Sequence, residues 1–190
     1  LLRILVVFGW ARLFLRNEFQ GLVWNKLDTL MTVWIATAAI IITLRIQTVS
    51  VAINQCGNIL DALGMYSLFR CILCDWRDIE TMIRSFALVS IPVALLFLVE
   101  RMTGRNLFSA FGGVPAVTIV REGSLRCQGA YSHAILAGTF WASMLPLFFS
   151  IWGSSRKAAV TATVTSIIIV LTCASSTPVM SVGFVLIGLG

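Results

Sequence analysis

Two arginines and the only histidine of the chain lie close together, directly before a long apolar segment. They are Arg121, Arg126 and His133. Guanidinium groups stay charged at physiological pH and present forked donors that match phosphate oxygens, so the arginines suit a diphosphate carried on a lipid. Histidine exchanges protons near neutral pH, so His133 can take the proton of an attacking hydroxyl. Together these residue types predict anion binding and base catalysis at one place.

The position of His133 supports this interpretation, because an apolar run begins at Ala134 and predicts a helix there. The N-terminus of a helix carries partial positive charge, which favours an anion and helps to keep an imidazole neutral. From charge alone, a second interpretation stays open. Arginines at a membrane interface often contact only lipid phosphates, and a histidine at a helix start can be a cap or a packed polar group.

Composition predicts the class of protein that must position these residues. Of 190 residues, 58% are hydrophobic and 12% are charged, and the mean hydropathy is +0.95. Such values are typical of an integral membrane protein. Lipid leaves only helices and closed barrels to a spanning backbone, and the apolar runs are too long for barrel strands. We therefore expect an all-α, polytopic helical bundle that forms a single transmembrane domain over 1–190. Since the chain begins at Leu1 and ends within an apolar run, we expect it to be a fragment.

Apolar runs predict the membrane spans, which are 1–15, 29–44, 50–70, 81–99, 133–152, 158–174 and 179–190. A helix needs about 20 apolar residues to cross a bilayer, with a range of about 17 to 25. The segment 50–70 is the least regular, because Asp61 interrupts it, and an interfacial helix is the alternative there. Arg70 follows Asp61 by roughly two and a half turns, so the two side chains cannot pair within one helix.

The basic residues then predict the orientation, because lysine and arginine favour the cytoplasmic side of short connections. Outside 100–132 they fall mostly on one side, and more strongly so if 50–70 crosses the membrane. The long connection 100–132 falls on the other side in both cases, which predicts a long periplasmic loop. Its arginines need a reason other than topology, and counter-charge from Glu100 and Glu122 supplies only part of one.

The composition of this loop argues against disorder, although long connections in compact proteins are usually either functional or disordered. Residues 106–120 are too apolar to stay solvated, so we expect them to fold back onto the membrane surface and the helix ends. Gly112, Gly113 and Pro115 predict a turn, and 117–120 a short strand.

The surroundings of His133 carry a longer pattern. The sequence LRCQGAYSHAILAGTF at 125–140, followed by MLPL at 144–147, looks like the signature region of the bacterial O-antigen ligase and O-antigen polymerase family. The preceding VERMTGRNLF at 99–108 resembles the end of the helix that leads into that family's large periplasmic loop. At 172–178, the sequence TCASSTP stands where these proteins often carry a serine-rich turn. The resemblance covers most of the chain.

The resemblance implies a multi-pass glycosyltransferase of the bacterial inner membrane that acts on the periplasmic face in surface polysaccharide and lipopolysaccharide assembly. Its donor would be a glycan on an undecaprenyl diphosphate carrier. Its acceptor would be a sugar hydroxyl, on the lipid A core for a ligase or on another glycan for a polymerase. The implied chemistry is independent of metal and cofactor, and the other expected partner is membrane lipid.

Carried over by position, Arg121 and Arg126 would hold the diphosphate and stabilise the charge that develops on the leaving group. His133 would orient or deprotonate the acceptor hydroxyl. Gly129 and Gly138 would allow a close approach of backbone or carrier lipid, although a glycine in a membrane helix can equally serve helix packing. The chain departs from the family at Ala134, where proline is common, and at Cys173, which stands where another small polar residue is expected.

Other functions remain as alternatives. A non-enzymatic transporter or channel for an anionic lipid or solute would use the same arginines, but it should show repeated halves, and no internal repeat is visible. In a structural membrane subunit the loop would bind a partner. Nucleic acid is not indicated, because the basic residues separate apolar runs. Cys71 and Cys74 lack the second pair of ligands that a metal site would need.

Overall fold

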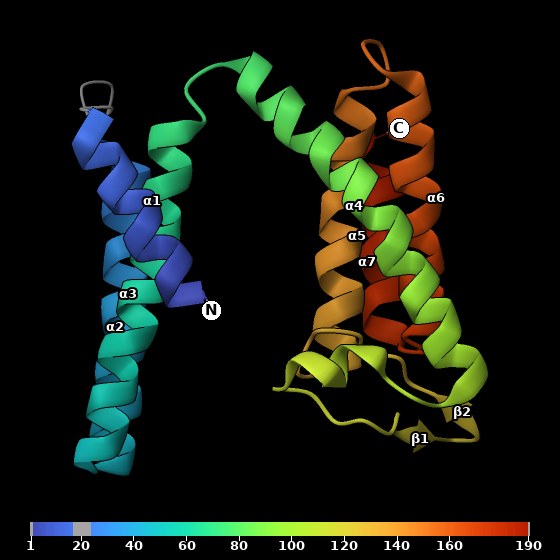
Figure 1. Cartoon of the computed structure of the whole chain (residues 1–190), viewed down its shortest axis with the longest axis horizontal. Coiled ribbons are helices and arrows are strands. Elements are labelled where there is room, and N and C mark those ends of the chain that lie inside the picture. Colours follow the sequence, from blue (N-terminus) through green and yellow to red (C-terminus); the bar gives the residue numbers. More distant parts are fainter. Residues whose placement is uncertain (1, 17–23, 190) are drawn as a thin grey trace. The chain divides into compact units, whose positions relative to one another are not determined.

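The computed structural model describes residues 2–16 and 24–189, and this part of the chain is mostly helical (Figure 1). The prediction of an all-α protein is confirmed. The helices are α1 (Leu2–Arg16), α2 (Lys26–Ile46), α3 (Val49–Ile72), α4 (Trp76–Thr103), α5 (Ala134–Ser150), α6 (Arg156–Thr172) and α7 (Ser176–Leu189). A short 3-10 helix, η2 (Leu107–Phe111), and two strands, β1 (Val120–Arg121) and β2 (Ser124–Leu125), lie in the connection between α4 and α5. Each predicted span overlaps one helix.

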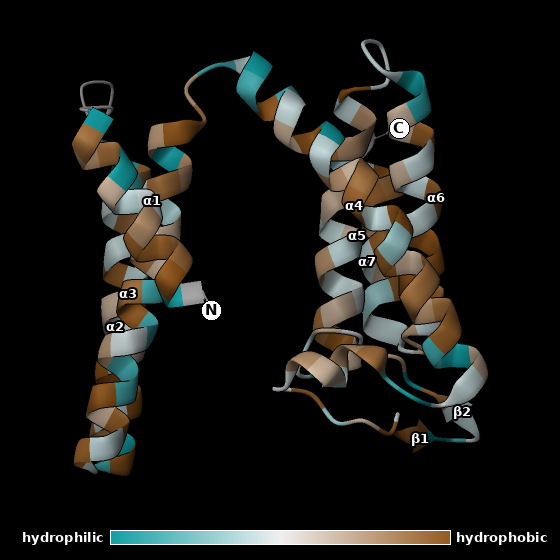
Figure 2. Ribbon diagram, viewed as in Figure 1, coloured by the Kyte–Doolittle hydropathy of each residue, from teal (hydrophilic) through white to brown (hydrophobic). Residues whose placement is uncertain are grey.

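Contacts divide the chain into two compact units, one up to Ile79 and one from Glu80 onward, and each is described by itself. That both belong to a single transmembrane bundle stays a prediction. Among the described residues, α2 and α4 are long and apolar enough to cross a membrane, while α5 and α7 are apolar but shorter. In α4 the charged residues lie near the two ends, up to Arg84 and from Glu100 onward, and the middle is apolar (Figure 2).

In the first unit, α1 packs against α3 through glycine. A Cβ atom added at Gly64 would collide with the side chain of Val6, so the absence of a side chain allows the two helices to approach closely. Trp10 Nε1 also donates to the carbonyl of Gly64 at 3.3 Å. The guanidinium of Arg3 lies over Gly57 and pairs with Asp61 at 3.2 Å.

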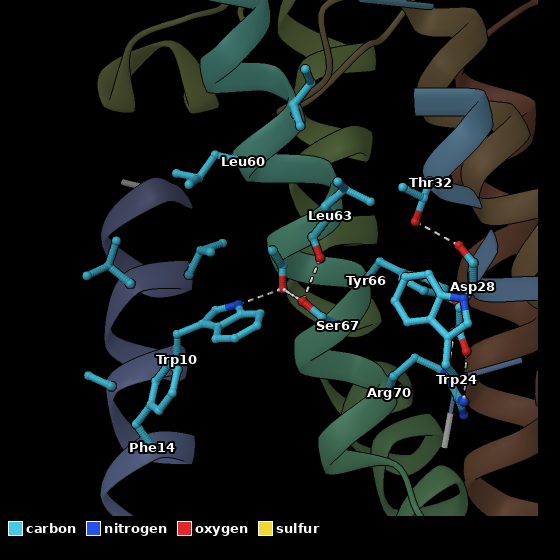
Figure 3. A pocket seen from close by; sticks show the side chains of 15 residues that line it. Trp10, Phe14, Trp24, Asp28, Thr32, Leu60, Leu63, Tyr66, Ser67 and Arg70 are labelled. Atoms are coloured by element: carbon cyan, nitrogen blue, oxygen red, sulfur yellow. Dashed lines mark hydrogen bonds and ion pairs between the residues drawn. The ribbon is translucent and has the colours of Figure 1, made fainter. Parts of the chain in front are cut away.

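A buried carboxylate joins α2 to α3. Asp28 accepts from Nε of Arg70 at 3.0 Å and from the hydroxyl of Tyr66 at 2.5 Å, and Asn25 caps the start of α2 beside it. As predicted, Asp61 and Arg70 do not pair with each other, because each reaches a different helix. Figure 3 shows Asp28, Tyr66 and Arg70 together at the edge of a cavity of about 710 Å³ that is bounded by α1, α2 and α3.

In the second unit, α5 packs against α6 and α7, and its buried face includes Ala137, Ala142 and Phe148. The hydroxyls of Ser90 in α4 and Thr165 in α6 form a buried hydrogen bond of 2.7 Å. Small side chains and hydroxyl contacts of this kind are the usual means by which helices associate where the surroundings are apolar. The unit therefore consists of α4 to α7, with the connection between α4 and α5 folded across one end (Figure 1).

The close packing of α5 on α7 leads to a stability prediction. A Cβ atom at Gly138 would lie 2.5 Å from Cγ of Pro178, and the proline ring cannot turn away. We expect Gly138→Ala to lower the free energy of unfolding by about 1 to 3 kcal/mol, as overpacking does elsewhere. Chemical denaturation in detergent measures the change.

Gly183→Ala in α7 is the matched control, because its added methyl group meets nothing within 4 Å. It should be neutral or stabilise the helix by up to about 1 kcal/mol, since alanine is the better helix former. If Gly138→Ala and Gly183→Ala change stability equally, the close contact between α5 and α7 is wrong.

Candidate functional site

The connection between α4 and α5 has a hydrogen-bonded structure of its own. Strands β1 and β2 pair antiparallel, and the two residues that join them, Glu122 and Gly123, both have positive φ angles, 53° and 74°. Two consecutive positive φ angles are typical of the tight turn that best matches the twist of a hairpin. The hairpin places Arg121 at the end of β1, next to the turn.

The rest of the connection agrees only in part with the prediction of a strand at 117–120. Val117 forms a single antiparallel bridge with Arg105, and only Val120 lies in β1. Gly112 and Gly113 have positive φ angles of 76° and 82°, as a turn there requires. Two backbone hydrogen bonds of 2.9 Å join separate segments of the connection. One runs from Thr118 N to Gly104 O, and the other from Arg126 N to Ile119 O.

Glu100, near the end of α4, anchors this connection. Its side chain is buried, and the residue is only 1% exposed. One carboxylate oxygen accepts from the hydroxyl of Thr118 at 2.9 Å and from the amide of Gln128 at 3.1 Å, and the other accepts from the amide of Gly129 at 3.0 Å. The carbonyl of Gly129 in turn accepts from Nδ2 of Asn106 at 2.7 Å. A buried carboxylate is costly unless its oxygens are hydrogen-bonded, and here both are.

The segment held by Glu100 runs directly into His133. Gln128 and Tyr131 exchange two hydrogen bonds of 3.0 Å, which close a turn between them. His133 then takes the N-cap position of α5 with an extended backbone, and its imidazole makes no capping hydrogen bond. The position at a helix start is therefore as predicted, but the side chain is not used as a cap. It is exposed and faces a small cavity.

Two neighbouring cavities bring the predicted site residues together. The larger, of about 330 Å³, is lined by Arg121, Glu122, Arg126 and Ile135 and by residues 174–177 around the turn between α6 and α7. The smaller, of about 120 Å³, is lined by Arg126, His133 and Gln128. Arg126 and Ile135 line both cavities, so Arg126 is the charged residue that links the anion-binding and the proton-accepting parts of the predicted site.

The charge of Arg126 is not neutralised by an ion pair with an acidic side chain of the described residues. Its Nε atom is buried and has no hydrogen-bond partner among the described residues. Glu100 is occupied by the donors of the connection, and Glu122 lies 3.6 Å from Arg121 in a pair in which both side chains are exposed. Exposed pairs of this kind contribute little, so the two arginines remain available to an anion.

The hydroxyls of Ser175, Ser176 and Thr177 are the part of the site that reasoning from residue types had missed. They lie around the start of α7, in residues that line the same cavity as the arginines. The resemblance indicated a serine-rich turn at this place but not what it contacts. The role of Glu100 was also missed, because it was considered only as counter-charge. An acidic residue at the end of an apolar helix is itself a signal, since such a group needs donors.

The two glycines of the predicted site have packing roles. Gly129 has a φ angle of +56°, and a Cβ atom there would collide with the ring of Phe97. Gly138 is buried against Pro178 and Cys173. Of the two roles considered for Gly138, close helix packing is therefore the one its contacts support, and neither glycine lines the two cavities.

Comparisons of the chain with models of protein families, with curated proteins and with solved structures found no match.

Removing the carboxylate of Glu100 should destabilise the connection. Glu100→Ala leaves two buried amides and one hydroxyl without an acceptor, and each unsatisfied group costs about 1 to 3 kcal/mol. We expect the free energy of unfolding of this unit to fall by about 3 kcal/mol or more in chemical denaturation. Thr118→Val, which removes only the hydroxyl, should cost about 1 kcal/mol. Equal effects of the two substitutions would contradict the anchoring role.

Cys127 provides a chemical reporter of the same anchor. Burial, with a smaller contribution from Glu100, raises the pKa of the Cys127 thiol to about 12, so the reactive thiolate is nearly absent at neutral pH. In a variant that retains only Cys127, N-ethylmaleimide should react at pH 7 at least about tenfold more slowly than in a variant that retains only the exposed Cys74. Adding Glu100→Ala should remove most of this difference. Rapid labelling of Cys127 without the Glu100→Ala substitution would show that the connection does not bury this thiol, which would contradict the anchoring role of Glu100.

Proposed function

We propose that this protein is a multi-pass glycosyltransferase of the bacterial inner membrane, similar to the O-antigen ligases and polymerases, with the connection between α4 and α5 on the periplasmic face. It transfers a glycan from an undecaprenyl diphosphate carrier to a sugar hydroxyl of a glycan or of the lipid A core. The observation that supports this most directly is the position of Arg126, which lines both the cavity with Arg121 and the cavity with His133.

The membrane part of the proposal is supported by α2 and α4, which have the length and composition of spans, and by the apolar composition of α5 and α7. The connection begins where α4 ends and folds across the end of the second unit. A site there lies at the level where a lipid-linked diphosphate leaves the hydrocarbon. The distribution of basic residues along the chain supports the periplasmic side.

The donor diphosphate lies in the larger cavity. Arg121 and Arg126 offer several guanidinium donors to its oxygens, and the hydroxyls at 175–177 offer further ones. As the bond between the anomeric carbon and the diphosphate oxygen breaks, negative charge grows on that oxygen. Donors already in place around developing charge accelerate such a step by about 100- to 1,000-fold each.

The acceptor hydroxyl enters beside His133. The imidazole accepts the proton of the hydroxyl while the hydroxyl oxygen forms the new bond to the anomeric carbon. Undecaprenyl diphosphate is the leaving group, and the two arginines bind its negative charge. Because Arg126 lines both cavities, the attacked carbon lies between the diphosphate and the imidazole. Positioned proton transfer contributes about 100- to 10,000-fold.

The proposal is tested by transfer in vitro from an undecaprenyl diphosphate-linked glycan, with chelator present and the intact protein in its membrane. Arg126→Ala and His133→Ala should each reduce the rate of product formation by about 100-fold or more, because each removes one part of the reaction. Arg126→Lys should recover little, since lysine keeps the charge but loses the forked geometry.

Arg105→Ala is the matched control, because Arg105 is an exposed arginine of the same connection that lines neither cavity. It should transfer at close to the normal rate. Normal product from both Arg126→Ala and His133→Ala would reject the proposal. Movement of the lipid or solute without formation of a glycosidic bond would favour the transporter alternative instead.

A further inference from the structure

Two buried cysteines lie beside the larger cavity, one in each of the segments that form it. Cys127 directly follows Arg126, and Cys173 directly precedes residues 174–177. Both cysteines are 0% exposed, and neither has a role in the proposed transfer reaction. The structure shows them as free thiols. A bond between them would join the two segments that line this cavity.

The backbone brings the two cysteines close together. The amide of Cys127 donates to the carbonyl of Thr172 at 3.3 Å, and this carbonyl belongs to the peptide group that leads into Cys173. Standard peptide geometry puts a Cα atom about 1.5 Å from its own nitrogen and about 2.8 Å from the preceding carbonyl oxygen. Because the amide nitrogen is planar, the path from one Cα atom to the other is bent, and the two are at most about 7 Å apart. Disulfides join Cα atoms about 4.4 to 6.8 Å apart, so the pair lies within reach of one.

The two sulfur atoms lie in one buried region. Ionised Cys127 acts electrostatically on Cys173, and the carboxylate of Glu100 acts on both thiols. Such interactions fall off with distance. Glu100 also accepts from the amide of Gln128, the residue after Cys127, which holds the carboxylate beside this pair.

The positions of the five cysteines along the chain distinguish this pair from the others. Cys71 and Cys74 lie near the end of α3, on the side that the distribution of lysine and arginine places in the cytoplasm. Cys56 lies within α3. Cys127 and Cys173 are on the side of the connection, which the proposed orientation places in the periplasm. Thiols persist in the cytoplasm, whereas the periplasm is oxidising.

We infer that Cys127 and Cys173 form a disulfide in the cell, which ties the connection to the turn between α6 and α7. This inference rests on the periplasmic placement in the proposed function but not on glycan transfer. The oxidant is the disulfide of a periplasmic thiol–disulfide oxidase. The thiolate of one cysteine attacks that disulfide and forms a mixed disulfide with the oxidase. The thiolate of the other cysteine then attacks the sulfur of the first, and the oxidase leaves as a dithiol that has taken up two electrons and two protons.

Burial determines when the bond can form. Burial raises the pKa of the Cys127 thiol to about 12, so the attacking thiolate is nearly absent in the closed structure. The exchange therefore takes place during folding, before the connection closes. Once it is buried, the disulfide is shielded from reductants, and it holds Arg126 and residues 174–177 around the same cavity.

The state of the cysteines is measured in the unsubstituted protein. Cells that produce it are quenched with acid, which stops thiol exchange, and the protein is alkylated with N-ethylmaleimide in sodium dodecyl sulfate. The intact mass should show three of the five cysteines alkylated, and all five after reduction. Trypsin cleaves after Arg126 and Lys157, so a peptide that begins at Cys127 should be linked to one that begins at Ala158.

Substitutions give a second, independent readout. Cys127→Ala and Cys173→Ala should each lower the thermal midpoint by about 5 to 15 °C. The double variant should lose much less than the sum of the two, because either substitution alone removes the whole bond. Additive losses would contradict the disulfide. Cys74→Ala is the matched control and should retain the linked peptides, because Cys74 is exposed and belongs to the other unit.

Five alkylated cysteines without reduction would overturn the inference. Prolonged treatment of the purified protein with diamide, which reaches the pair whenever the connection opens, then identifies the cause. If diamide links the pair, the connection is in a reducing compartment, and the periplasmic placement is wrong as well. If diamide does not link the pair, the geometry is wrong, and the proposed function is unaffected. Linked cysteines in a protein without transfer activity would support the disulfide and count against glycan transfer alone.

Discussion

The carboxylate of Glu100 is the interaction on which the arrangement of the site depends. It is buried near the end of α4, and its oxygens accept from Thr118 in the middle of the connection and from the amides of Gln128 and Gly129 near its end. A buried carboxylate would be very costly without such donors, so the chain gains stability only when all parts of the connection meet at this point. That requirement sets the positions of the segments of the connection, of the turn before His133 and of the start of α5.

The same interaction explains why positive charge is left over at the site. A carboxylate close to arginines commonly forms ion pairs with them, but Glu100 is used by backbone amides and a hydroxyl instead. Glu122, the other acidic residue of the connection, is exposed beside Arg121 and screens it only weakly. Arg126 therefore keeps a buried nitrogen without a partner among the described residues. The anion of the proposed function would supply the missing partner.

Glycine and hydroxyl residues give the helices their close packing, and this packing places the second half of the site. Pro178 fits against Gly138, which holds the start of α7 close to α5. The turn between α6 and α7 is thereby brought to the arginines of the hairpin, across a large separation in sequence. A methyl group at Gly138 would displace Pro178 and with it that turn, so a residue that lines neither cavity affects the shape of the larger one. The packing of α7 on α5 therefore sets where the backbone of the turn places the residues that line the larger cavity.

The sequence by itself determined the helices and the neighbourhood of the site. Apolar runs and their breaks depend on local composition, so every predicted span overlaps a helix, and the position of His133 at the start of α5 could be predicted from Ala134 onward. The strand expected at 117–120 was only partly correct, because a strand needs a partner and local pattern does not name one. Only the tertiary structure decided that Glu100 anchors the connection, that Ser175 to Thr177 line the same cavity as the arginines and that Arg126 lines two cavities. These contacts join residues far apart in the chain, and their geometry depends on how helices pack, which no local pattern encodes.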